Sequence, residues 1–324
     1  MGSARPVVCI VTPGTRDANN GNWRTAARWA GMLREKCKVI VQSEWDGRRA
    51  DLMVALHAFR SAGSIARFRE RSPGSPIALM LTGTDIYGEL GRTPEAARSM
   101  AAATRIVTLQ EHAREQLPRA LRAKAVVIFQ SAAPLARLPK RAGRLDCVAA
   151  GHLRAVKDPV TLFAAMRLLA PGLPIELGHF GSALDAGLGD EALALQAHDP
   201  RYRFHGPQSH ARVRAAIRAA HVLVHPSLAE GGANVIVEAV TAGTPVIASR
   251  VPGNVGMLGK RYAGYFEPGD ARALAMRLER ALREPSWLAR LRSQCAERRP
   301  LFRPATEMRA VRRLVAELLL QGGA

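Results

Sequence analysis

Two glutamates have the residue type and the spacing to hold a polar ligand. Glu230 and Glu238 lie eight positions apart in the stretch HPSLAEGGANVIVEAVTAGTPVIAS, which runs from His225 to Ser249. On a single helix of about 3.6 residues per turn, this spacing would leave the two side chains about 80° out of line. We therefore expect Glu230 on a loop and Glu238 on the helix that follows. A carboxylate accepts two hydrogen bonds at once, which suits the neighbouring hydroxyls of a ribose.

The residues between these glutamates predict a site for an anion. Gly231 and Gly232 carry no side chain, so their backbone N–H groups are accessible, and Asn234 is a suitable N-cap for the helix. The N-terminus of a helix attracts negative charge. A nucleotide sugar, which combines a ribose, a diphosphate and a sugar, would satisfy all three features. The alternative is a solvated Glu230 and a Glu238 that only stabilises its own helix.

The elements that must position these residues follow a pattern typical of parallel α/β domains. Short apolar runs alternate with helical segments in both halves of the chain. Strands are predicted at 6–12, 38–43, 51–57, 77–83, 105–110, 125–131, 145–153, 174–180, 201–206, 221–227 and 244–249. Helices are predicted at 22–36, 61–71, 93–103, 111–121, 157–170, 209–220, 234–243 and 270–284, with an amphipathic helix near the C-terminus.

The pattern also predicts two doubly wound domains. Periodicity is lost at 132–144, where proline and basic residues gather, which indicates a linker. We expect an N-terminal domain at 1–138, a C-terminal domain at 145–300, and a helix at 301–324 that packs back on the N-terminal domain. In two such domains that face a cleft, a ligand binds beyond the carboxyl ends of the strands.

Composition argues against a nucleic-acid-binding or membrane protein. The 324 residues carry a formal charge of +20, but the basic residues are spread along helices, and only 5% of residues are aromatic, which is poor for stacking on bases. No apolar run approaches the ~18 residues of a membrane span, and the first is too short for a signal peptide. Cys9, Cys37, Cys147 and Cys295 lack metal-ligand spacing and predict reduced thiols. We expect a cytoplasmic protein with no nucleic-acid partner and no stable membrane association.

The segment from His225 resembles the C-terminal signature of the large family of GT-B glycosyltransferases that take nucleotide-sugar donors. The matching residues are His225-Pro226-Ser227, Glu230, Glu238-Ala239, Gly243, Pro245-Val246-Ile247-Ala248-Ser249 and Gly253. The resemblance implies two Rossmann-like, parallel-sheet domains facing a cleft. It implies that Glu238 holds the donor ribose and Glu230 the hydroxyls of the sugar. The diphosphate would then lie against the backbone of Gly231, Gly232, Asn234 and Val235.

The family's second donor element follows the first strand of the C-terminal domain and usually reads Gly-Arg-Leu, three residues, Lys-Gly. The corresponding segment here is GHLRAVKDP, from Gly151 to Pro159, with Lys157 on the family's lysine and His152 on its arginine. Arg154 follows two residues after His152. The resemblance leaves open which of the three cations meets the diphosphate. We favour Arg154 with Lys157, because a guanidinium fork fits two phosphate oxygens.

Polar residues in the N-terminal half are candidates for the acceptor site. His57 and Asp85 each lie where a predicted strand ends, at the edge where a cleft would be. They are candidates to orient the acceptor and join Glu230 as proposed catalytic groups. The candidates for binding the acceptor are Asn20, Gly21, Asn22, Arg60 and Thr84. Asn22 is also expected to cap the first helix. An ordinary turn and a structural histidine are the alternatives.

Several strings, NGNW, ALHAFRSA, LTGTDIY, FQSA and GHLRAVKDP, resemble a compact branch of the family, the selenosugar synthases of selenoneine biosynthesis. This resemblance implies transfer of N-acetylglucosamine from its UDP donor to the selenium of selenophosphate, and loss of phosphate to leave a 1-selenosugar. A downstream enzyme of that pathway would be a partner. The expected mechanism needs no metal or other cofactor. A GT-B enzyme acting on a hydroxyl of a sugar, lipid or small molecule is the alternative. The sugar, the anomeric outcome and the oligomeric state stay open.

Overall fold

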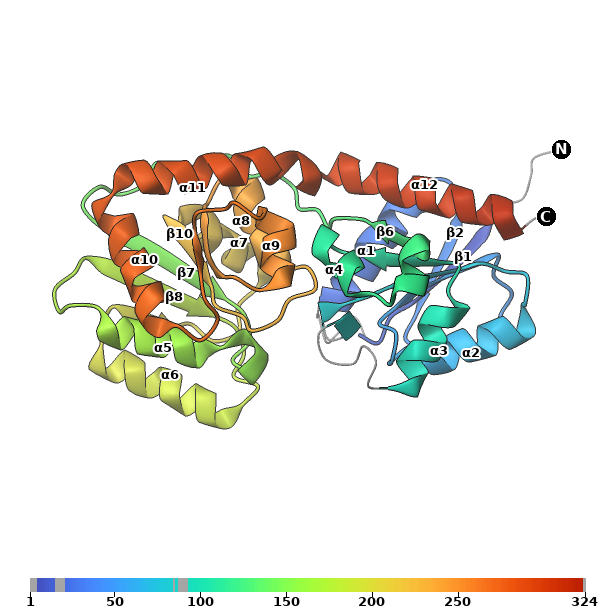
Figure 1. The fold of residues 1–324 in the computed structure, drawn as a ribbon, viewed down its shortest axis with the longest axis horizontal. Coiled ribbons are helices and arrows are strands. Elements are labelled where there is room, and N and C mark those ends of the chain that lie inside the picture. Colours follow the sequence, from blue (N-terminus) through green and yellow to red (C-terminus); the bar gives the residue numbers. More distant parts are fainter. Residues whose placement is uncertain (1–4, 15–20, 84, 87–92, 323–324) are drawn as a thin grey trace. The chain divides into compact units, whose positions relative to one another are not determined.

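The computed structural model describes residues 5–14, 21–83, 85–86 and 93–322 and divides the chain into two compact units. Unit 1 comprises Met1–Gln130 and Pro304–Ala324, and unit 2 comprises Ser131–Arg303. Each unit has its own parallel sheet with helices around it (Figure 1). The end of the chain therefore belongs to the same unit as its beginning.

Unit 1 is built on a six-stranded parallel sheet in the order β2-β1-β3-β4-β5-β6. Its strands are β1 (Val7–Val11), β2 (Lys38–Gln42), β3 (Leu52–Leu56), β4 (Ile77–Met80), β5 (Arg105–Thr108) and β6 (Ala125–Val127). Its helices include α1 (Gly21–Leu33), α2 (Ala62–Arg71), α3 (Pro94–Ala102), α4 (Glu111–Gln116), the 3-10 helix η2 (Arg119–Lys124) and α12 (Pro304–Gly322). Every residue of β3 is buried, because helices cover both faces of a parallel sheet.

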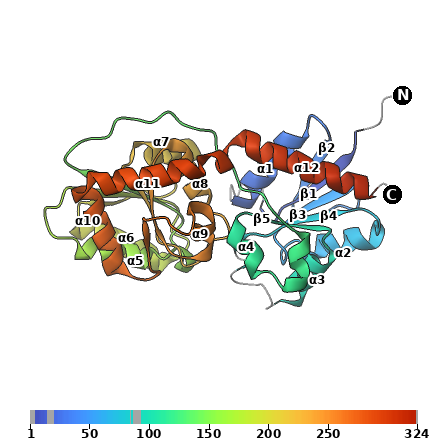
Figure 2. The ribbon, with the colours of Figure 1, turned by 45° about the horizontal axis from the view of Figure 1, so that its top comes forward.

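Helix α12 completes the core of unit 1 from the far end of the chain. Its apolar face is buried in the same cluster as Trp29 of α1, and the two helices lie side by side in both views (Figures 1 and 2). Glu307 of α12 is buried and accepts hydrogen bonds from Arg28 at 2.8 and 3.1 Å and from the indole of Trp29 at 2.9 Å. A buried carboxylate is costly unless it is paired. These contacts therefore fix the position of α12 along α1.

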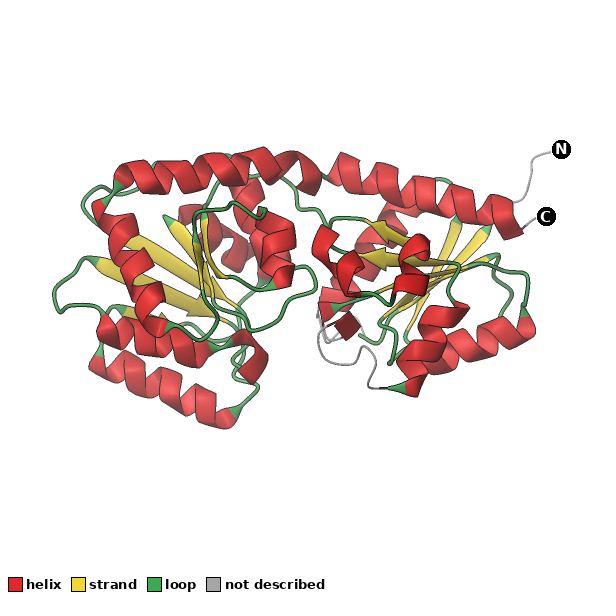
Figure 3. Ribbon diagram, in the orientation of Figure 1, coloured by secondary structure: helices red, strands yellow, loops and turns green. Residues whose placement is uncertain are grey.

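Unit 2 is built on a second six-stranded parallel sheet, in the order β12-β11-β10-β7-β8-β9, with helices on both faces (Figure 3). Its strands are β7 (Leu145–Ala150), β8 (Ile175–Phe180), β9 (Tyr202–Phe204), β10 (Val222–His225), β11 (Val246–Ser249) and β12 (Tyr265–Phe266). Its helices include η3 (Ala155–Lys157), α5 (Pro159–Leu168), α6 (Ala186–His198), α7 (His210–Ala219), α8 (Asn234–Ala242), α9 (Pro252–Leu258), α10 (Ala271–Arg283), α11 (Pro285–Arg298) and η4 (Arg299–Phe302). Strands β7 and β10 lie side by side in the middle of the sheet. Strands β8 and β9 follow on the side of β7, and β11 and β12 follow on the side of β10.

The strands and helices predicted from periodicity are confirmed, with shifts at their ends. The largest shift is at α4, which ends at Gln116 because the residue before Pro118 cannot stay helical. Helices α6, α9 and α11 and strand β12 were not predicted. Two glycines in the first turn of α6 weaken its helical signal, and Pro285 at the start of α11 reads as a break. No helix within the described ranges has the length and the apolar character to cross a membrane.

Candidate active site

The two glutamates of the sequence prediction lie on separate elements beyond the carboxyl end of β10 in unit 2. Glu230 is on the loop that follows β10, and Glu238 is inside α8. Strand β10 and its neighbour β7 form the point at which the strand order reverses. At such a point the loops leave in opposite directions and make room for a ligand. The residues of interest therefore lie at the edge where doubly wound sheets bind their substrates.

Glu230 is a buried carboxylate held by two basic side chains. Its Oε1 forms an ion pair with Nζ of Lys157 and lies 3.1 Å from Nε2 of His225. The side chain of Glu230 is 9% exposed and that of Lys157 is 23% exposed. Burial alone would raise the pKa of Glu230, but the charge of Lys157 and the contact with His225 outweigh it and hold the pKa well below its ordinary value. Glu230 is therefore ionised at neutral pH and suited to accept hydrogen bonds.

A tight turn between η3 and α5 brings Lys157 to Glu230. Asp158 has a left-handed backbone, with φ of 49°, which aspartate tolerates better than most residues. Its carboxylate caps α5 by accepting from the backbone N–H of Thr161 at 3.3 Å and from its hydroxyl at 2.6 Å. Pro159 takes the first helical position, where a missing N–H is harmless. The sequence KDP thus starts α5 and turns Lys157 toward the loop of Glu230.

The loop of Glu230 is held in place by residues at the end of β11 and just after it. A Cβ on Gly253 would lie 1.7 Å from the carbonyl oxygen of Glu230, so a larger residue would push the loop away. Ser249 donates its hydroxyl to the carbonyl of Ser227 at 2.5 Å, and the amide of Asn254 donates to the carbonyl of Ser249 at 3.0 Å. The match of Gly253 to the family signature therefore has a steric reason.

Glu238 is buried one turn into α8 and is paired with a histidine from α7. Nε2 of His210 lies 2.6 Å from Oε1 of Glu238. The side chain of Glu238 is 11% exposed, whereas that of His210 is 43% exposed. A carboxylate held by one imidazole keeps a fixed orientation while its remaining lone pairs can accept other donors. The pair therefore presents Glu238 as an oriented hydrogen-bond acceptor.

The start of α8 differs from the sequence prediction. We expected Asn234 as the N-cap, but Asn234 is the first helical residue and Ala233 occupies the cap position, with no hydrogen bond from a capping side chain. Gly231, which is buried, and Gly232 and Val235, which are half-buried, surround this start. A missing side-chain cap costs about 1 kcal/mol. It also leaves the first N–H groups of the helix to a ligand, and a helix start with accessible N–H groups favours an anion.

The three cations considered for the diphosphate differ in their availability. Nδ1 of His152 accepts a hydrogen bond from the backbone N–H of Ser182 at 3.0 Å, so this nitrogen carries no proton. Lys157 is paired with Glu230. Arg154 lies just before η3, and its side chain is exposed. Among the residues that the structure describes, Arg154 is therefore the cation of the three for whose side chain no hydrogen bond or ion pair is found.

In unit 1, the structure brings His57 and Asp85 together as a buried pair beyond the neighbouring strands β3 and β4. Nδ1 of His57 lies 2.8 Å from Oδ1 of Asp85, and both side chains are almost fully buried. Asp85 also accepts from the backbone N–H of Ala58 at 2.8 Å and of Thr82 at 2.7 Å, and from the hydroxyl of Thr82 at 3.0 Å. With so many donors the carboxylate has one orientation, and it fixes the ring of His57.

The backbone of His57 is in a conformation that side chains rarely adopt. Its φ is 76°, in the left-handed region, which costs about 1–3 kcal/mol for a residue other than glycine. The backbone N–H of His57 donates to the carbonyl of Met80 at 2.9 Å, and the side chain is held by Asp85. Such conformations persist where surrounding contacts enforce them, and they gather at functional sites. This observation adds weight to His57 as a functional residue.

The other acceptor candidates are placed only in part. Gly21 and Asn22 are the first two residues of α1, so Asn22 is not the N-cap that the sequence predicted. Arg60 has an exposed side chain, and its backbone nitrogen lies 3.4 Å from Nδ1 of His57. Asn20 and Thr84 lie outside the described residues. Of the five, the structure therefore connects Arg60 to the pair of His57 and Asp85.

Sequence reasoning gave no role to His210, and gave His225 and Gly253 only a place in a signature. His225 could have been found, because it lies near the end of the strand predicted at 221–227, just before the loop of Glu230, and it is the last residue of β10 in the structure. His210 has no comparable signal. It is 28 positions from Glu238, and a lone histidine at the start of a helix predicts no partner.

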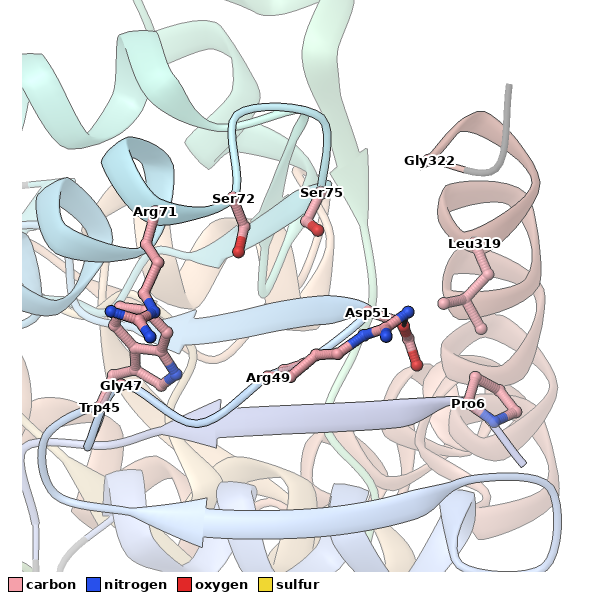
Figure 4. A pocket seen from close by; sticks show the side chains of 11 residues that line it. Pro6, Trp45, Gly47, Arg49, Asp51, Arg71, Ser72, Ser75, Leu319 and Gly322 are labelled. Carbon is pink, nitrogen blue, oxygen red and sulfur yellow. Dashed lines mark ion pairs between the residues drawn. The ribbon is translucent and has the colours of Figure 1, made fainter. Parts of the chain in front are cut away.

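A hollow of about 680 Å³ in unit 1 reaches the edge of the sheet where β1 and β3 begin, whereas His57 and Asp85 follow the ends of β3 and β4. Figure 4 shows the residues that line it. Its lining includes Pro6 and Asp51, which directly precede β1 and β3. The figure also shows the hydroxyls of Ser72 and Ser75 on its wall. None of the residues predicted for the acceptor lines it. Because doubly wound sheets bind substrates at their carboxyl edge, this hollow is a poor place for the acceptor.

Two doubly wound parallel sheets with a ligand edge of this kind define the GT-B class of glycosyltransferases, and solved structures agree. The chain is similar to the crystal structure of Anabaena HepE in complex with UDP and glucose, with a TM-score of 0.76 and 15% identity over 96% of this chain and 100% of that chain. It is also similar to sucrose-phosphate synthase from Thermosynechococcus elongatus, with a TM-score of 0.77 and 18% identity over 98% of this chain and 100% of that chain. At these identities the likeness establishes the fold, which confirms the predicted fold class.

Sequence comparison supplies the family. The D-inositol 3-phosphate glycosyltransferase of Nocardiopsis dassonvillei is 31% identical over 169 residues, which are 48% of this chain and 39% of that protein. Its counterpart in Streptomyces avermitilis is 27% identical over 300 residues, which are 81% of this chain and 65% of that protein. The chain therefore spans less than two thirds of either relative. Residues 135–300, just over half of the chain, match the family model of the group 1 glycosyl transferases. The protein belongs to that family.

Proposed function

We propose that this protein transfers a sugar from a UDP-sugar, with UDP-N-acetylglucosamine as the expected donor. The observation that carries the proposal is the cluster of Glu230, Lys157 and His225 near the start of α8, where no side-chain cap is described. These residues lie in the segment that matches the family model. The fold shared with HepE, whose structure holds UDP and glucose, supports a uridine nucleotide as the leaving group.

The donor would bind with its ribose on Glu238 and its diphosphate at the start of α8. His210 would donate to one oxygen of Glu238 and leave the carboxylate free to accept from the ribose hydroxyls. The N–H groups of α8, together with Arg154 and Lys157, would place positive charge where the leaving diphosphate develops negative charge. This mechanism calls for no metal ion or other cofactor.

Glu230 would bind the transferred sugar. Its pKa is held below the ordinary value, so it keeps its charge at neutral pH and would accept hydrogen bonds from sugar hydroxyls. For the same reason we do not assign it a proton transfer. Lys157 would then bridge Glu230 and the diphosphate, which ties the position of the sugar to that of the leaving group.

For the acceptor we propose selenophosphate, supported by the resemblance of several strings to selenosugar synthases. Selenium would attack the anomeric carbon, so that a carbon–selenium bond forms as the carbon–oxygen bond to the diphosphate breaks and UDP leaves with the electron pair. Water would then cleave the phosphorus–selenium bond and release phosphate, leaving a 1-selenosugar. Because selenophosphate is already a strong nucleophile, His57 and Asp85 would orient it, with Arg60 as a partner for its charge.

A hydroxyl acceptor that carries a phosphate is the second candidate. The curated relatives are named D-inositol 3-phosphate glycosyltransferases, which favours such an acceptor. A hydroxyl is a weak nucleophile and needs a base, and the pair of His57 and Asp85 has the geometry of a histidine oriented by a carboxylate. The two candidates therefore differ in the role they require of His57.

The location proposed for this reaction is the cytoplasm. Cys9, Cys37, Cys147 and Cys295 are all free and buried, which suits a reducing compartment. A reducing compartment would also keep selenium in the oxidation state that the proposed acceptor requires.

The decisive experiment is mass spectrometry of the purified protein with UDP-N-acetylglucosamine and either selenophosphate, D-inositol 3-phosphate or no acceptor. A selenium-bearing hexosamine that forms only with selenophosphate would support the first candidate, and His57→Asn should then retain much of the activity. A product that forms only with D-inositol 3-phosphate, together with loss of activity in His57→Asn, would refute selenophosphate as the acceptor and support the hydroxyl acceptor. Absence of UDP release with every acceptor, and of UDP binding by calorimetry, would refute the proposed use of a UDP-sugar.

A further inference from the structure

A hollow of about 440 Å³ in unit 2 collects basic side chains at the end of α8 that lies away from the donor residues. Helix α8 begins at the proposed diphosphate site and ends at the hollow, about 13 Å away for nine residues at ~1.5 Å each. The rest of the wall comes from the segment before β7, from α11 and from the first residue of η4. The lining residues are Leu135, Arg137, Ala242, Gly243, Ala289, Arg292, Ser293, Ala296 and Arg299.

Lys140 is a fourth cation, outside the lining of the hollow, whose charge interacts with those of Arg137 and Arg292 on its wall. Its Nζ donates to the carbonyl oxygen of Arg218. Burial and the nearby charges of Arg137 and Arg292 lower the pKa of Lys140 to about 8. Burial and Arg137 also lower the pKa of Arg292. Lys140, Arg137 and Arg292 therefore repel one another, which lowers the pKa of Lys140 and of Arg292.

No carboxylate forms an ion pair with these four cations in the part of the chain that the structure describes. Arg299 donates instead to the carbonyl of Val240 at 3.3 Å, near the C-terminal end of α8. Asp146, whose charge acts on Lys140, is itself paired with Arg144 at 2.7 Å. By contrast, Arg201 elsewhere in unit 2 binds Asp199 at 2.7 Å. The positive charge of the hollow is therefore not neutralised by the protein.

We propose that this hollow binds a phosphate group, as inorganic phosphate or a small phosphomonoester, at a site separate from the donor site. Guanidinium forks pair with two oxygens of one phosphate, and Arg137, Arg292 and Arg299 surround one space. A dianion there would relieve the repulsion among Lys140, Arg137 and Arg292. The small side chains on the rest of the wall leave room for a compact group, and the volume is within the range of small-molecule sites.

The first test is calorimetric titration of inorganic phosphate into the whole protein and three variants. Arg292→Gln and Arg137→Gln each remove one charge from the hollow. Arg290→Gln is the matched control, because it removes the same charge from an exposed position on the same helix, two residues away. We expect saturable binding to the unaltered protein and to Arg290→Gln, and about tenfold weaker binding to the other two, since a charge-assisted hydrogen bond to a phosphate oxygen is lost.

The second test locates the ion through Lys140. An amine with a pKa of about 8 is half neutral at pH 8, so an amine-acylating reagent should label Lys140, as read by peptide mass spectrometry. A phosphate bound beside Arg137 and Arg292 offsets their charge and favours the protonated form of Lys140, which an acylating reagent does not attack. We expect phosphate to slow the labelling of Lys140 severalfold in the unaltered protein and in Arg290→Gln, but not in Arg292→Gln. A phosphate bound at the donor site would have no such effect.

Equal affinity of Arg290→Gln and Arg292→Gln for phosphate, or labelling of Lys140 that phosphate does not change, would overturn the proposal. Binding to vesicles of phosphatidylcholine with phosphatidic acid, without any binding of inorganic phosphate, would overturn it as well, because the phosphate would then belong to a lipid headgroup. Circular dichroism establishes that each variant is folded. If the Arg292→Gln variant is not folded, the comparison of Arg137→Gln with Arg290→Gln decides, since Arg137 lies on a segment without helix or strand.

Discussion

Replacement of Lys157 by methionine should reveal the cost of keeping Glu230 both buried and charged. Loss of one partner from a buried ion pair costs about 3–5 kcal/mol, because the other charge is left without compensation. Here the cost is smaller, since His225 stays 3.1 Å from Glu230 and the Lys157 side chain is 23% exposed to water. We expect Lys157→Met to lower the free energy of unfolding of unit 2 by about 2–3 kcal/mol at pH 7.

The loss of unfolding free energy in Lys157→Met should become smaller as the pH falls. In the folded protein the pKa of Glu230 is lowered, so the pair stabilises the fold above the unfolded pKa of ~4.3, and this contribution is lost as the pH falls below that value. In Lys157→Met the effect of burial is no longer outweighed by the lysine charge, and Glu230 takes up a proton more readily. The difference between the two proteins should therefore be largest at pH 7 and shrink toward pH 4.

Urea unfolding followed by pulsed hydrogen exchange provides the assay. Peptides of unit 2 are read separately, because a protein of two units need not unfold in a single step. Lys260→Met is the matched control, since it removes an exposed lysine from the same unit and should cost no more than about 0.5 kcal/mol. The added change Glu230→Gln should recover part of the loss in Lys157→Met. A loss that is equal at pH 7 and pH 4.5, or no larger than in the control, would refute the reasoning.

Three further predictions concern the same unit and the division of roles between the units. Gly253→Ala should destabilise unit 2 by about 2–3 kcal/mol in urea unfolding, because its Cβ would lie 1.7 Å from the carbonyl of Glu230. Burial lowers the pKa of His179 to about 4. As the pH falls, this histidine therefore takes up a proton in the unfolded state before it does so in the folded state, and the free energy of unfolding decreases. Between pH 7 and pH 5 this amounts to about 2 kcal/mol, which urea unfolding should show and His179→Asn should remove. Glu238→Ala should weaken UDP binding in calorimetry at least tenfold, whereas Arg60→Ala should leave UDP binding unchanged and raise the KM of the acceptor. Equal effects on UDP binding would contradict the proposed roles.

The part of the site that the sequence predicts is the part set by local spacing. A strand predicted at 221–227, which ends at His225 in the structure, and a helix that begins near Asn234 follow from apolar runs and breaks within a few residues. That was enough to place Glu230 on a loop and Glu238 on a helix, because the loop between two such elements has few alternatives. The fold class followed for the same reason, since alternating strands and helices predict parallel sheets.

What the sequence could not predict is which side chains share a contact across the sheet. The ion pair of Lys157 with Glu230 spans 73 positions, and the pair of His210 with Glu238 spans 28. No periodicity carries information over such distances. The expected cap at Asn234 was wrong for a related reason. Cap preference is a local tendency of about 1 kcal/mol, and the surrounding loop, held by Gly253, decides where the helix starts.

The two anion sites proposed for unit 2 lie at opposite ends of α8, and their electrostatic coupling should be weak. The helix has its positive end at Asn234, where the diphosphate would bind, and its negative end near Val240, where Arg299 donates to a carbonyl. Two dianions about 13 Å apart repel by about 1 kcal/mol in bulk water. With a Debye length of about 8 Å at physiological salt, most of that repulsion is screened. The helix itself adds no more than a few tenths of a kcal/mol, because its end effects fall off within one turn. The hollow therefore does not need to compete with the donor for charge, and an ion there can neutralise the arginines without reducing the attraction of α8 for the diphosphate.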